Sequence, residues 1–293
     1  MRVRKAIFPA AGWGTRLLPA TKALPKEMLP LVDKPVIQYS IEEAVAAGIE
    51  HVVVVTSSQK RPIEDHFDHN YELEQMLEEK GDIDNLREIR QIGDMVQISY
   101  VRQKEQLGLG HAVLMAKEAI GHEPFAVMLP DDVMVGDRPC IGQLIDAYNR
   151  THGSLVAVME VSDEEVSRYG VIDPDMDADT NDERLHKVQR LVEKPDAGSA
   201  PSNLAIIGRY VLTPKIFEKL ESTPRGAGGE IQLTDAISSL ISDEQDVYAY
   251  EFEGKRYDAG TTMGWLQASV ELALERPDIG GEFRRFLSGL DLS

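Results

Sequence analysis

A glycine loop followed by fixed positive charges carries the clearest chemical signal in the sequence. Gly12 and Gly14 come directly after an apolar run that ends at Pro9, and Arg16 and Lys26 follow them. Glycine permits backbone angles and a close approach that a Cβ would forbid, so main-chain N–H groups here can point at an anion. The loop has neither the Lys-Ser or Lys-Thr of a Walker A motif nor the third glycine of the dinucleotide fingerprint. We therefore predict a phosphate site of another type, the alternative being a purely structural strand-to-helix turn.

Carboxylates follow two other strand-like runs. Asp131 and Asp132 come directly after the run 125–130, and Asp258 ends a run that begins at Lys255. Hard oxygen ligands of this kind suit Mg²⁺, which takes one or two carboxylates and shares its other positions with phosphates and water. A turn with solvated acids is the alternative. The sequence also leaves open whether Asp132 or only Asp131 would touch the metal.

A third cluster is Glu193-Lys194, which also follows an apolar run. A glutamate can accept two hydrogen bonds from neighbouring sugar hydroxyls, and the adjacent lysine supplies a point charge for a phosphate. The same pair before Pro195 is also a common surface turn. The histidines form no convincing metal set, and no Gly-x-Ser-x-Gly nucleophile elbow occurs.

These groups suit a reaction between two anions. When a sugar phosphate attacks the α-phosphorus of a nucleoside triphosphate, the nucleophile is already charged and needs no general base. The barrier is then mainly electrostatic repulsion and alignment, both of which are reduced by positioned cations and Mg²⁺.

Composition narrows the choice of partner. The 293 residues contain 50 acidic and 31 basic side chains, and the formal net charge of −19 repels nucleic acid and anionic membranes at long range. Cys140 is the only cysteine, so no intrachain disulfide can form, and we expect a buried or inert thiol. No stretch approaches the roughly 18 apolar residues needed to span a bilayer. We expect a cytoplasmic protein that binds small molecules.

The periodicity predicts an α/β fold. Strands are expected at Lys5–Pro9, His51–Thr56, Val96–Arg102, Phe125–Leu129, Leu155–Val161, Lys187–Val192, Leu204–Leu212 and near Val247–Phe252. Helices are expected at Lys34–Gly48, Gly108–Ile120, Ile141–His152, Glu230–Ile241 and Met263–Glu275, with a charged helical insertion at 63–93. This alternation indicates a doubly wound, Rossmann-like mixed sheet with helices on both faces, in which ligands lie beyond the carboxyl ends of the strands. The three clusters follow predicted strands.

The motifs together resemble the signature of sugar-nucleotide pyrophosphorylases. The resemblance starts with Ala10-Ala11-Gly12-x-Gly14-Thr15-Arg16 and Pro25-Lys26-Glu27. It continues in order along most of the chain through 103–112, Leu129-Pro130-Asp131-Asp132, 168–172, Val192-Glu193-Lys194-Pro195, 229–235 and Tyr257-Asp258-Ala259-Gly260. Such collinearity is far more specific than any single motif.

The resemblance implies a role for each residue. The nucleotide would be bound by Ala11, Gly12, Gly14, Thr15, Gln103 and Gly108, with Glu27 supporting the base pocket. The catalytic cations would be Arg16, Lys26 and Lys194, and Mg²⁺ would be held by Asp131 and Asp258. The sugar phosphate would be bound by Gly170, Glu193 and Lys194. Arg16 and Lys26 would stabilise the charge of a leaving pyrophosphate. One domain, 1–293, would carry nucleotide binding mainly in 1–160 and sugar-phosphate binding, in a smaller lobe, together with C-terminal helices in 161–293.

The implied reaction is transfer of a uridylyl group from UTP to α-D-glucose 1-phosphate by Mg²⁺-dependent in-line displacement, in a homodimer or homotetramer. The 71–90 insertion and the 229–235 segment favour the uridylyltransferase branch of the family. Thymidylyltransferases, which use dTTP, share the loop, the metal acids and the Glu-Lys-Pro element and remain the near alternative. An inactive, nucleotide-sensing relative is the alternative outside enzymes.

Overall fold

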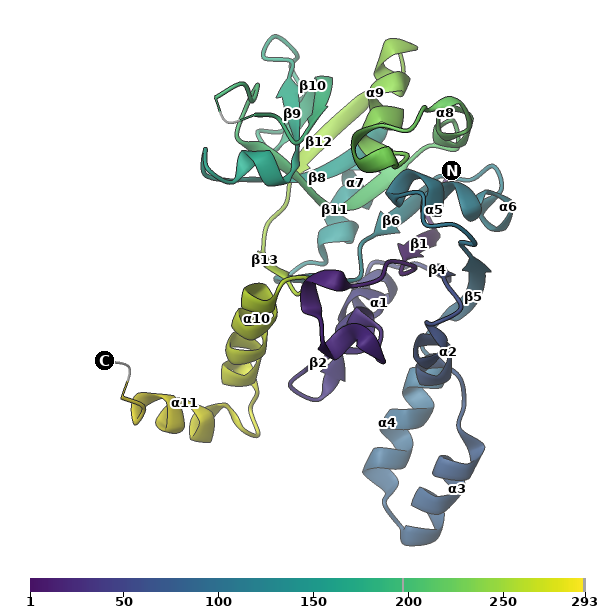
Figure 1. The fold of residues 1–293 in the computed structure, drawn as a ribbon, viewed down its shortest axis with the longest axis vertical. Helices are drawn as coiled ribbons and strands as arrows, with labels where there is room; N and C mark the ends of the chain where they lie inside the picture. Colours follow the sequence, from purple (N-terminus) through teal and green to yellow (C-terminus); the bar gives the residue numbers. More distant parts are fainter. Residues whose placement is uncertain (197, 292–293) are drawn as a thin grey trace.

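The computed structural model describes residues 1–196 and 198–291, which build one mixed sheet of nine strands (Figure 1). Across the sheet the strands are β5 (Gln97–Arg102), β4 (His51–Thr56), β1 (Lys5–Pro9), β6 (Phe125–Met128), β11 (Leu204–Leu212), β8 (Ser154–Glu160), β12 (Val247–Glu251), β10 (Leu185–Glu193) and β9 (Gly170–Pro174). The first four are parallel to one another, and β11 runs antiparallel to both β6 and β8. The parallel half therefore ends where β11 begins.

Because successive side chains of a strand point to opposite faces of the sheet, the buried strands form one apolar layer on each face. In β1, Ala6 and Phe8 belong to one core cluster and Ile7 to the other. The first cluster packs under α1 (Val36–Ala46), α2 (Arg61–Phe67) and α7 (Cys140–Thr151), and the second under α5 (Leu109–Met115), α6 (Lys117–Ile120), α8 (Ile216–Ser222) and α9 (Leu233–Ser242). Helices on both faces confirm the predicted doubly wound class.

The charged insertion forms α2 and a projecting hairpin of α3 (Tyr71–Lys80) and α4 (Ile83–Gly93) (Figure 1). The helix predicted from Glu230 begins only at Leu233. The reason is that Ile231 bonds elsewhere: its N–H donates to the Leu107 carbonyl at 2.7 Å, and its carbonyl accepts from Gly110 N–H at 2.9 Å. A local sequence pattern cannot show hydrogen bonds between segments so far apart in the chain.

A small second layer joins the sheet to the C-terminal helices. It consists of β7 (Asp132–Val135) paired antiparallel with β13 (Lys255–Asp258), the short pair β2 (Pro30–Leu31) and β3 (Lys34–Pro35), and α10 (Thr262–Glu275), which leads to α11 (Gly280–Ser288). Short 3₁₀ turns are η1 (Thr15–Leu17), η2 (Ala20–Lys22), η3 (Lys26–Met28), η4 (Val166–Arg168) and η5 (Ala227–Gly229). The Asp258↔Asp132 register of β13 and β7 brings acids from distant parts of the chain together. Among the described helices, none has the length and apolar character needed to cross a membrane.

Candidate active site

A cavity of about 660 Å³, here called the phosphate cleft, opens beyond the carboxyl ends of the parallel strands. Its walls include the loop from Ala11 to Arg16, together with Lys26, Gln103, Gly108, Asp131, Glu230 and Gly260. The structure therefore brings together Ala11, Gly12, Gly14, Thr15, Arg16, Lys26, Gln103, Gly108 and Asp131 of the predicted site. Glu27, Asp258, Gly170, Glu193 and Lys194 do not line it.

The two loop glycines differ in whether the fold itself requires a glycine at that position. Gly14 has a left-handed backbone (φ 68°), and a Cβ there would lie 3.1 Å from Lys26 Cβ, so the turn itself favours glycine. A Cβ on Gly12 would meet nothing within 4 Å. The fold therefore imposes no steric need for glycine at position 12, and the close approach of a ligand would supply one.

The cations of the cleft converge on one carboxylate. Lys26 Nζ lies 2.5 Å from Asp131 Oδ2, and Arg16 Nη2 lies 3.9 Å from the same oxygen. Burial alone would lower the pKa of Lys26, but the carboxylates of Asp131 and Glu27 outweigh it and raise that pKa. Burial opposes ionisation of Asp131 as well, and the Lys26 ammonium outweighs it, so the pKa of Asp131 falls. Both groups are held charged, while the Arg16 side chain is 62% exposed.

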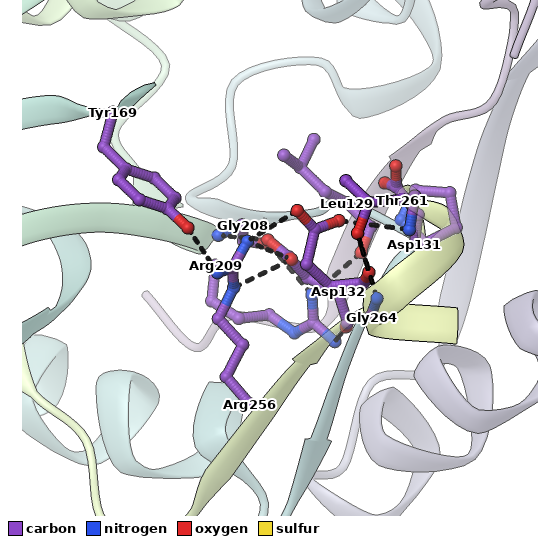
Figure 2. Close-up of polar contacts among 12 residues, drawn as sticks. Leu129, Asp131, Asp132, Tyr169, Gly208, Arg209, Arg256, Thr261 and Gly264 are labelled. Carbon is purple, nitrogen blue, oxygen red and sulfur yellow. Dashed lines mark hydrogen bonds and ion pairs between the residues drawn. The ribbon is translucent and has the colours of Figure 1, made fainter. Parts of the chain in front are cut away.

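Asp132 faces away from this cluster and is fully engaged by the protein (Figure 2). Its Oδ1 accepts from Arg256 Nε at 2.8 Å and pairs with Nη2 at 2.6 Å, and its Oδ2 accepts from Gly208 N–H at 2.9 Å. Both oxygens of Asp132 thus have protein partners, and Asp131 is the acid of the pair that lines the cleft. Which of the two would touch a metal stays a prediction.

The donor set around Gly260 fits a hard cation. A Cβ built on Gly260 would collide with Asp131 Oδ2 and would lie 3.1 Å from Asp258 Oδ1 and 3.2 Å from Arg16 Nη2. Glycine thus allows two carboxylates from distant segments to approach the same point of the backbone. Among the described residues no third His, Cys, Asp or Glu joins them. Two carboxylates are the number of protein ligands that Mg²⁺ commonly takes when its other positions go to phosphate and water oxygens.

The turn that presents Asp131 is held from below by Arg209, which the sequence analysis missed. The guanidinium is completely buried and pairs with Glu43, with Nη2–Oε2 at 2.6 Å. It also donates to the carbonyls of Leu129 at 3.0 Å and Asp132 at 2.7 Å. An Arg in the strand run 204–212 is the one local signal, because an unpaired charge is not tolerated in a buried strand.

Glu27 supports the cleft from behind. Its Oε2 lies 2.8 Å from Lys60 Nζ, both side chains are buried, and its Oε1 has no hydrogen-bond partner among the residues that the structure describes. Burial raises the pKa of Glu27 against the opposing influence of Lys60 and Lys26. Glu27 therefore helps to hold η3, and with it Lys26, rather than contacting a ligand in the cleft.

Away from the cations, the cleft is lined by the amide side chains of Gln103 and Gln106. Gly108 has φ 97°, and a Cβ there would collide with Glu230 Cβ at 2.6 Å. Gln106 Nε2 donates to the Ala11 carbonyl at 2.8 Å and so fixes the start of the glycine loop. Gln106 and Glu230 lie inside the motif segments 103–112 and 229–235, but only the fold shows that they face the cleft.

The predicted sugar-phosphate residues Gly170, Glu193 and Lys194 form a separate group together with Thr234, here called the Glu193 cluster. Gly170 on β9 pairs with Glu193 on β10, and a Cβ on Gly170 would lie 3.1 Å from Glu193 Oε2. That oxygen also accepts from Thr234 Oγ1 at 2.8 Å. Lys194 Nζ lies 3.5 Å from Glu193 Oε1, and its side chain is 56% exposed.

Arg256 lies between Asp132 and Tyr169, the residue that precedes Gly170 of the Glu193 cluster (Figure 2). While two of its nitrogens hold Asp132, Nη1 donates to Tyr169 Oη at 3.1 Å and the guanidinium lies 5.3 Å from the centre of that ring. The Tyr169 carbonyl in turn accepts from Lys194 N–H at 3.0 Å. Asp132, the neighbour of the cleft acid Asp131, is therefore joined to the backbone of the Glu193 cluster through Arg256 and Tyr169.

Comparison with known proteins shows the family of the chain. The family model for nucleotidyl transferases matches residues 5–275. The chain is 54% identical over 289 residues to UTP–glucose-1-phosphate uridylyltransferase of Bacillus subtilis (strain 168), covering 99% of this chain and 97% of that relative. Among solved structures, a UTP-bound UGPase from Acinetobacter baumannii superposes with a TM-score of 0.91 at 44% identity, covering 99% of this chain and all of the other.

A UDP-glucose pyrophosphorylase complexed with UDP-glucose superposes with a TM-score of 0.84 at 46% identity, covering 94% of this chain and 100% of the other. These likenesses extend over nearly the whole chain and include the cleft, the Glu193 cluster and the segments that join them. The protein belongs to the nucleotidyl transferase family, and within it to the UTP–glucose-1-phosphate uridylyltransferases.

Proposed function

We propose that this protein transfers the uridylyl group of UTP to α-D-glucose 1-phosphate, giving UDP-glucose and pyrophosphate. The observation that carries the proposal is the pairing of a cation-lined phosphate cleft with the Glu193 cluster through Arg256. The first has the charges for a triphosphate, and the second has a carboxylate and a lysine for a sugar phosphate. Relatives named for this reaction, at more than half identity over the full chain, support the same conclusion.

In the proposed reaction a phosphate oxygen of the sugar phosphate attacks the α-phosphorus of UTP. A new O–P bond forms as the bond from the α-phosphorus to the bridging oxygen breaks, and the electron pair leaves with pyrophosphate. Since the nucleophile is already an anion, no side chain has to remove a proton. The protein's task is to align two polyanions and to offset their charge.

Lys26 and Arg16 would meet the charge that develops on the leaving pyrophosphate. The Asp131 contact keeps Lys26 ionised in a buried position, so its charge is in place before substrate arrives. A unit charge pair about 4 Å apart at an effective dielectric near 20 is worth roughly 4 kcal/mol. Even a third of that, realised only in the transition state, is about a tenfold rate effect.

Asp131 and Asp258 would hold Mg²⁺, whose chemistry when bound is to neutralise phosphate charge and to orient the phosphate oxygens. Glu193 would accept hydrogen bonds from two hydroxyls of the glucose ring, with Gly170 leaving the ring room. Lys194 would contact the phosphate of glucose 1-phosphate. The backbones of Ala11, Gly12 and Gly108 and the amide of Gln103 would surround the nucleoside.

The test is a matrix of nucleotides and sugar phosphates read by pyrophosphate release. UTP with glucose 1-phosphate should give the highest kcat/KM, followed by dTTP with the same sugar. A clear preference for dTTP would assign a thymidylyltransferase instead. Tight nucleotide binding with no turnover for any pair would assign a nucleotide-sensing protein.

Three further parts of the proposal concern the setting of the reaction. We propose that turnover depends on Mg²⁺, that the protein works in the cytoplasm, and that it forms a homodimer or homotetramer. The first is checked by activity after removal of divalent cations and their restoration, the second by cell fractionation, and the third by light scattering of the purified chain.

A further inference from the structure

Trp13 lies in the glycine loop between Gly12 and Gly14, and its side chain is not part of the folded core. The residue is 59% exposed and belongs to none of the hydrophobic core clusters. Neither its backbone nor its indole makes a hydrogen bond or a ring contact with the described residues. The other tryptophan, Trp265, packs against a core cluster and donates from Nε1 to the Pro30 carbonyl at 3.1 Å. The fold therefore uses Trp265 and leaves the indole of Trp13 uncovered.

Three cavities meet at Trp13. Besides the phosphate cleft, it lines a cavity of about 420 Å³, whose wall it shares with Gln103 and Gln106. It also lines a cavity of about 240 Å³ on the side of Ala11. Among the described residues, Trp13 is the one that lines all three, and neither smaller cavity includes the buried lysine and aspartate of the cleft. Trp13 therefore borders the end of the cleft where the proposed function places the nucleoside.

The backbone beside Trp13 leaves room for a ligand to lie against the indole. A Cβ on Gly12 would meet nothing within 4 Å, so the space next to that residue is open. Glycine on either side of Trp13 also widens the range of backbone angles that the loop can adopt. An indole offers a large, flat apolar surface, and a planar ring laid on it would remove apolar surface of both rings from water.

We infer that Trp13 stacks on the base of the bound nucleotide and closes the nucleoside end of the cleft. This inference rests on the proposed function. Stacking uses the face of a base, whereas hydrogen bonds use its edge, and every base has a π-face. The contact therefore raises the affinity for nucleotides without choosing among their bases. It contributes nothing to the binding of a ligand that has phosphates but no base.

The first test removes the ring from the protein. In Trp13→Ala, the Kd for UTP, measured by calorimetry with Mg²⁺ present, should rise roughly 5- to 100-fold, the range expected for loss of one base–aromatic stack. The Kd for dTTP should rise by the same factor to within about twofold, because thymine has the same kind of ring face. The Kd for inorganic pyrophosphate should stay within about twofold of its starting value, since pyrophosphate has no base. Trp13→Phe retains a ring face and should keep most of the affinity for UTP.

The second test removes the aromatic face from the ligand. Dihydrouridine triphosphate has a saturated C5–C6 bond, so its ring is neither planar nor aromatic, while its N3–H and both carbonyl groups are those of UTP. The unaltered protein should bind UTP more tightly than this analogue, and the ratio of the two Kd values should shrink at least about threefold in Trp13→Ala. Because the two ligands share one hydrogen-bonding edge, recognition of that edge cancels in the comparison.

Fluorescence locates the contact, because Trp13 and Trp265 are the only tryptophans of the sequence. UTP should quench the emission of Trp265→Phe, in which Trp13 remains, and should leave the emission of Trp13→Phe nearly unchanged. Trp265→Phe is also the matched control, and its Kd for UTP should equal that of the unaltered protein.

An unchanged Kd for UTP in Trp13→Ala, or no quenching by UTP in Trp265→Phe, would overturn the inference. So would an equal rise in the Kd values for UTP and pyrophosphate, which would show that Trp13 holds the phosphate loop in place. A ratio of UTP to dihydrouridine triphosphate that is the same with and without Trp13 would also overturn it. The proposed function fails in a different way, since it requires the unaltered protein to turn over UTP with glucose 1-phosphate.

Discussion

The phosphate cleft and the Glu193 cluster use charge in opposite ways. In the cleft, Lys26 is buried against Asp131 and both groups are held ionised. In the Glu193 cluster, the carboxylate accepts from the neutral hydroxyl of Thr234, and Lys194, whose Nζ lies 3.5 Å from Glu193 Oε1, is 56% exposed. A buried, preformed cation suits charge that appears only in the transition state, whereas an exposed one suits capture of a phosphate. The difference predicts which kinetic constant each region controls.

The largest effect is expected from the acids of the cleft. Asp131→Asn and Asp258→Asn should each lower kcat by at least about a hundredfold and raise the Mg²⁺ concentration that gives half-maximal rate, because each removes a charged ligand. The measurement is a Mg²⁺ titration of pyrophosphate release.

Asp132→Asn is the matched control for these variants. It removes a carboxylate from the same turn but leaves Arg256 buried without its charged partner, so the free energy of unfolding should drop by roughly 3 kcal/mol. Its half-maximal Mg²⁺ concentration should stay near that of the unaltered protein. If Asp132→Asn shifted the Mg²⁺ titration as far as Asp131→Asn, the assignment of the two acids would be wrong.

On the sugar side, Lys194→Ala should raise the KM for glucose 1-phosphate about tenfold, equivalent to about 1.4 kcal/mol of binding, and leave the KM for UTP unchanged. The measurement is initial rates with each substrate varied in turn. Lys187→Ala removes another partly exposed lysine from β10, where it pairs with Asp246 at 2.9 Å, and serves as control. An effect of Lys194→Ala on kcat alone would contradict the contrast between the two regions.

A smaller effect is expected from the contact of Arg256 with Tyr169, here called the bridge, which lies between the phosphate cleft and the Glu193 cluster. Tyr169→Phe removes the hydrogen bond from Arg256 Nη1 while keeping the ring under the guanidinium, a loss of about 1 kcal/mol. We expect the KM for glucose 1-phosphate to rise about fivefold, with the Mg²⁺ titration unchanged. Equal changes for both substrates would show that the bridge supports the cleft as much as the Glu193 cluster.

The smallest effect on activity belongs to a charge pair at the opposite end of the same parallel strands. Arg4 Nε lies 2.6 Å from Glu123 Oε2, and this contact lowers the pKa of Glu123 to about 2. A lowered carboxyl pKa stabilises the fold above its ordinary value near 4.5, and this stability is lost as the pH falls through about 2. Glu123→Gln should keep full activity and unfold at lower denaturant above pH 4.5.

The difference in unfolding midpoint between Glu123→Gln and the unaltered protein should shrink as the pH is lowered from 4.5 toward 2. A constant difference across that range would assign the effect to packing instead of charge.

Much of this organisation could be predicted from the sequence. The valine run at His51–Thr56 and the apolar run at Leu204–Leu212 gave strands with the right bounds, because strands buried on both faces are marked by their own composition. The cleft residues could be named because glycines and cations in one short segment share one strand end.

The features that could not be predicted from the sequence depend on contacts between distant segments. Nothing near Asp132 in the chain shows that Arg256, 124 residues away, will occupy its carboxylate. The same holds for Arg209 beneath the Asp131 turn, 166 residues from its partner Glu43.

The position of β11 between β6 and β8 has a consequence for synthesis of the chain. Since translation proceeds from the N-terminus, β6 is made well before β11, and the edge of β6 that β11 will cover lacks its partner until residues 204–212 have left the ribosome. All four β6 residues are apolar and buried in the finished sheet, so that edge is a template for pairing with another nascent chain. Truncations that end between β6 and β11 should therefore aggregate, whereas the complete chain covers the edge itself.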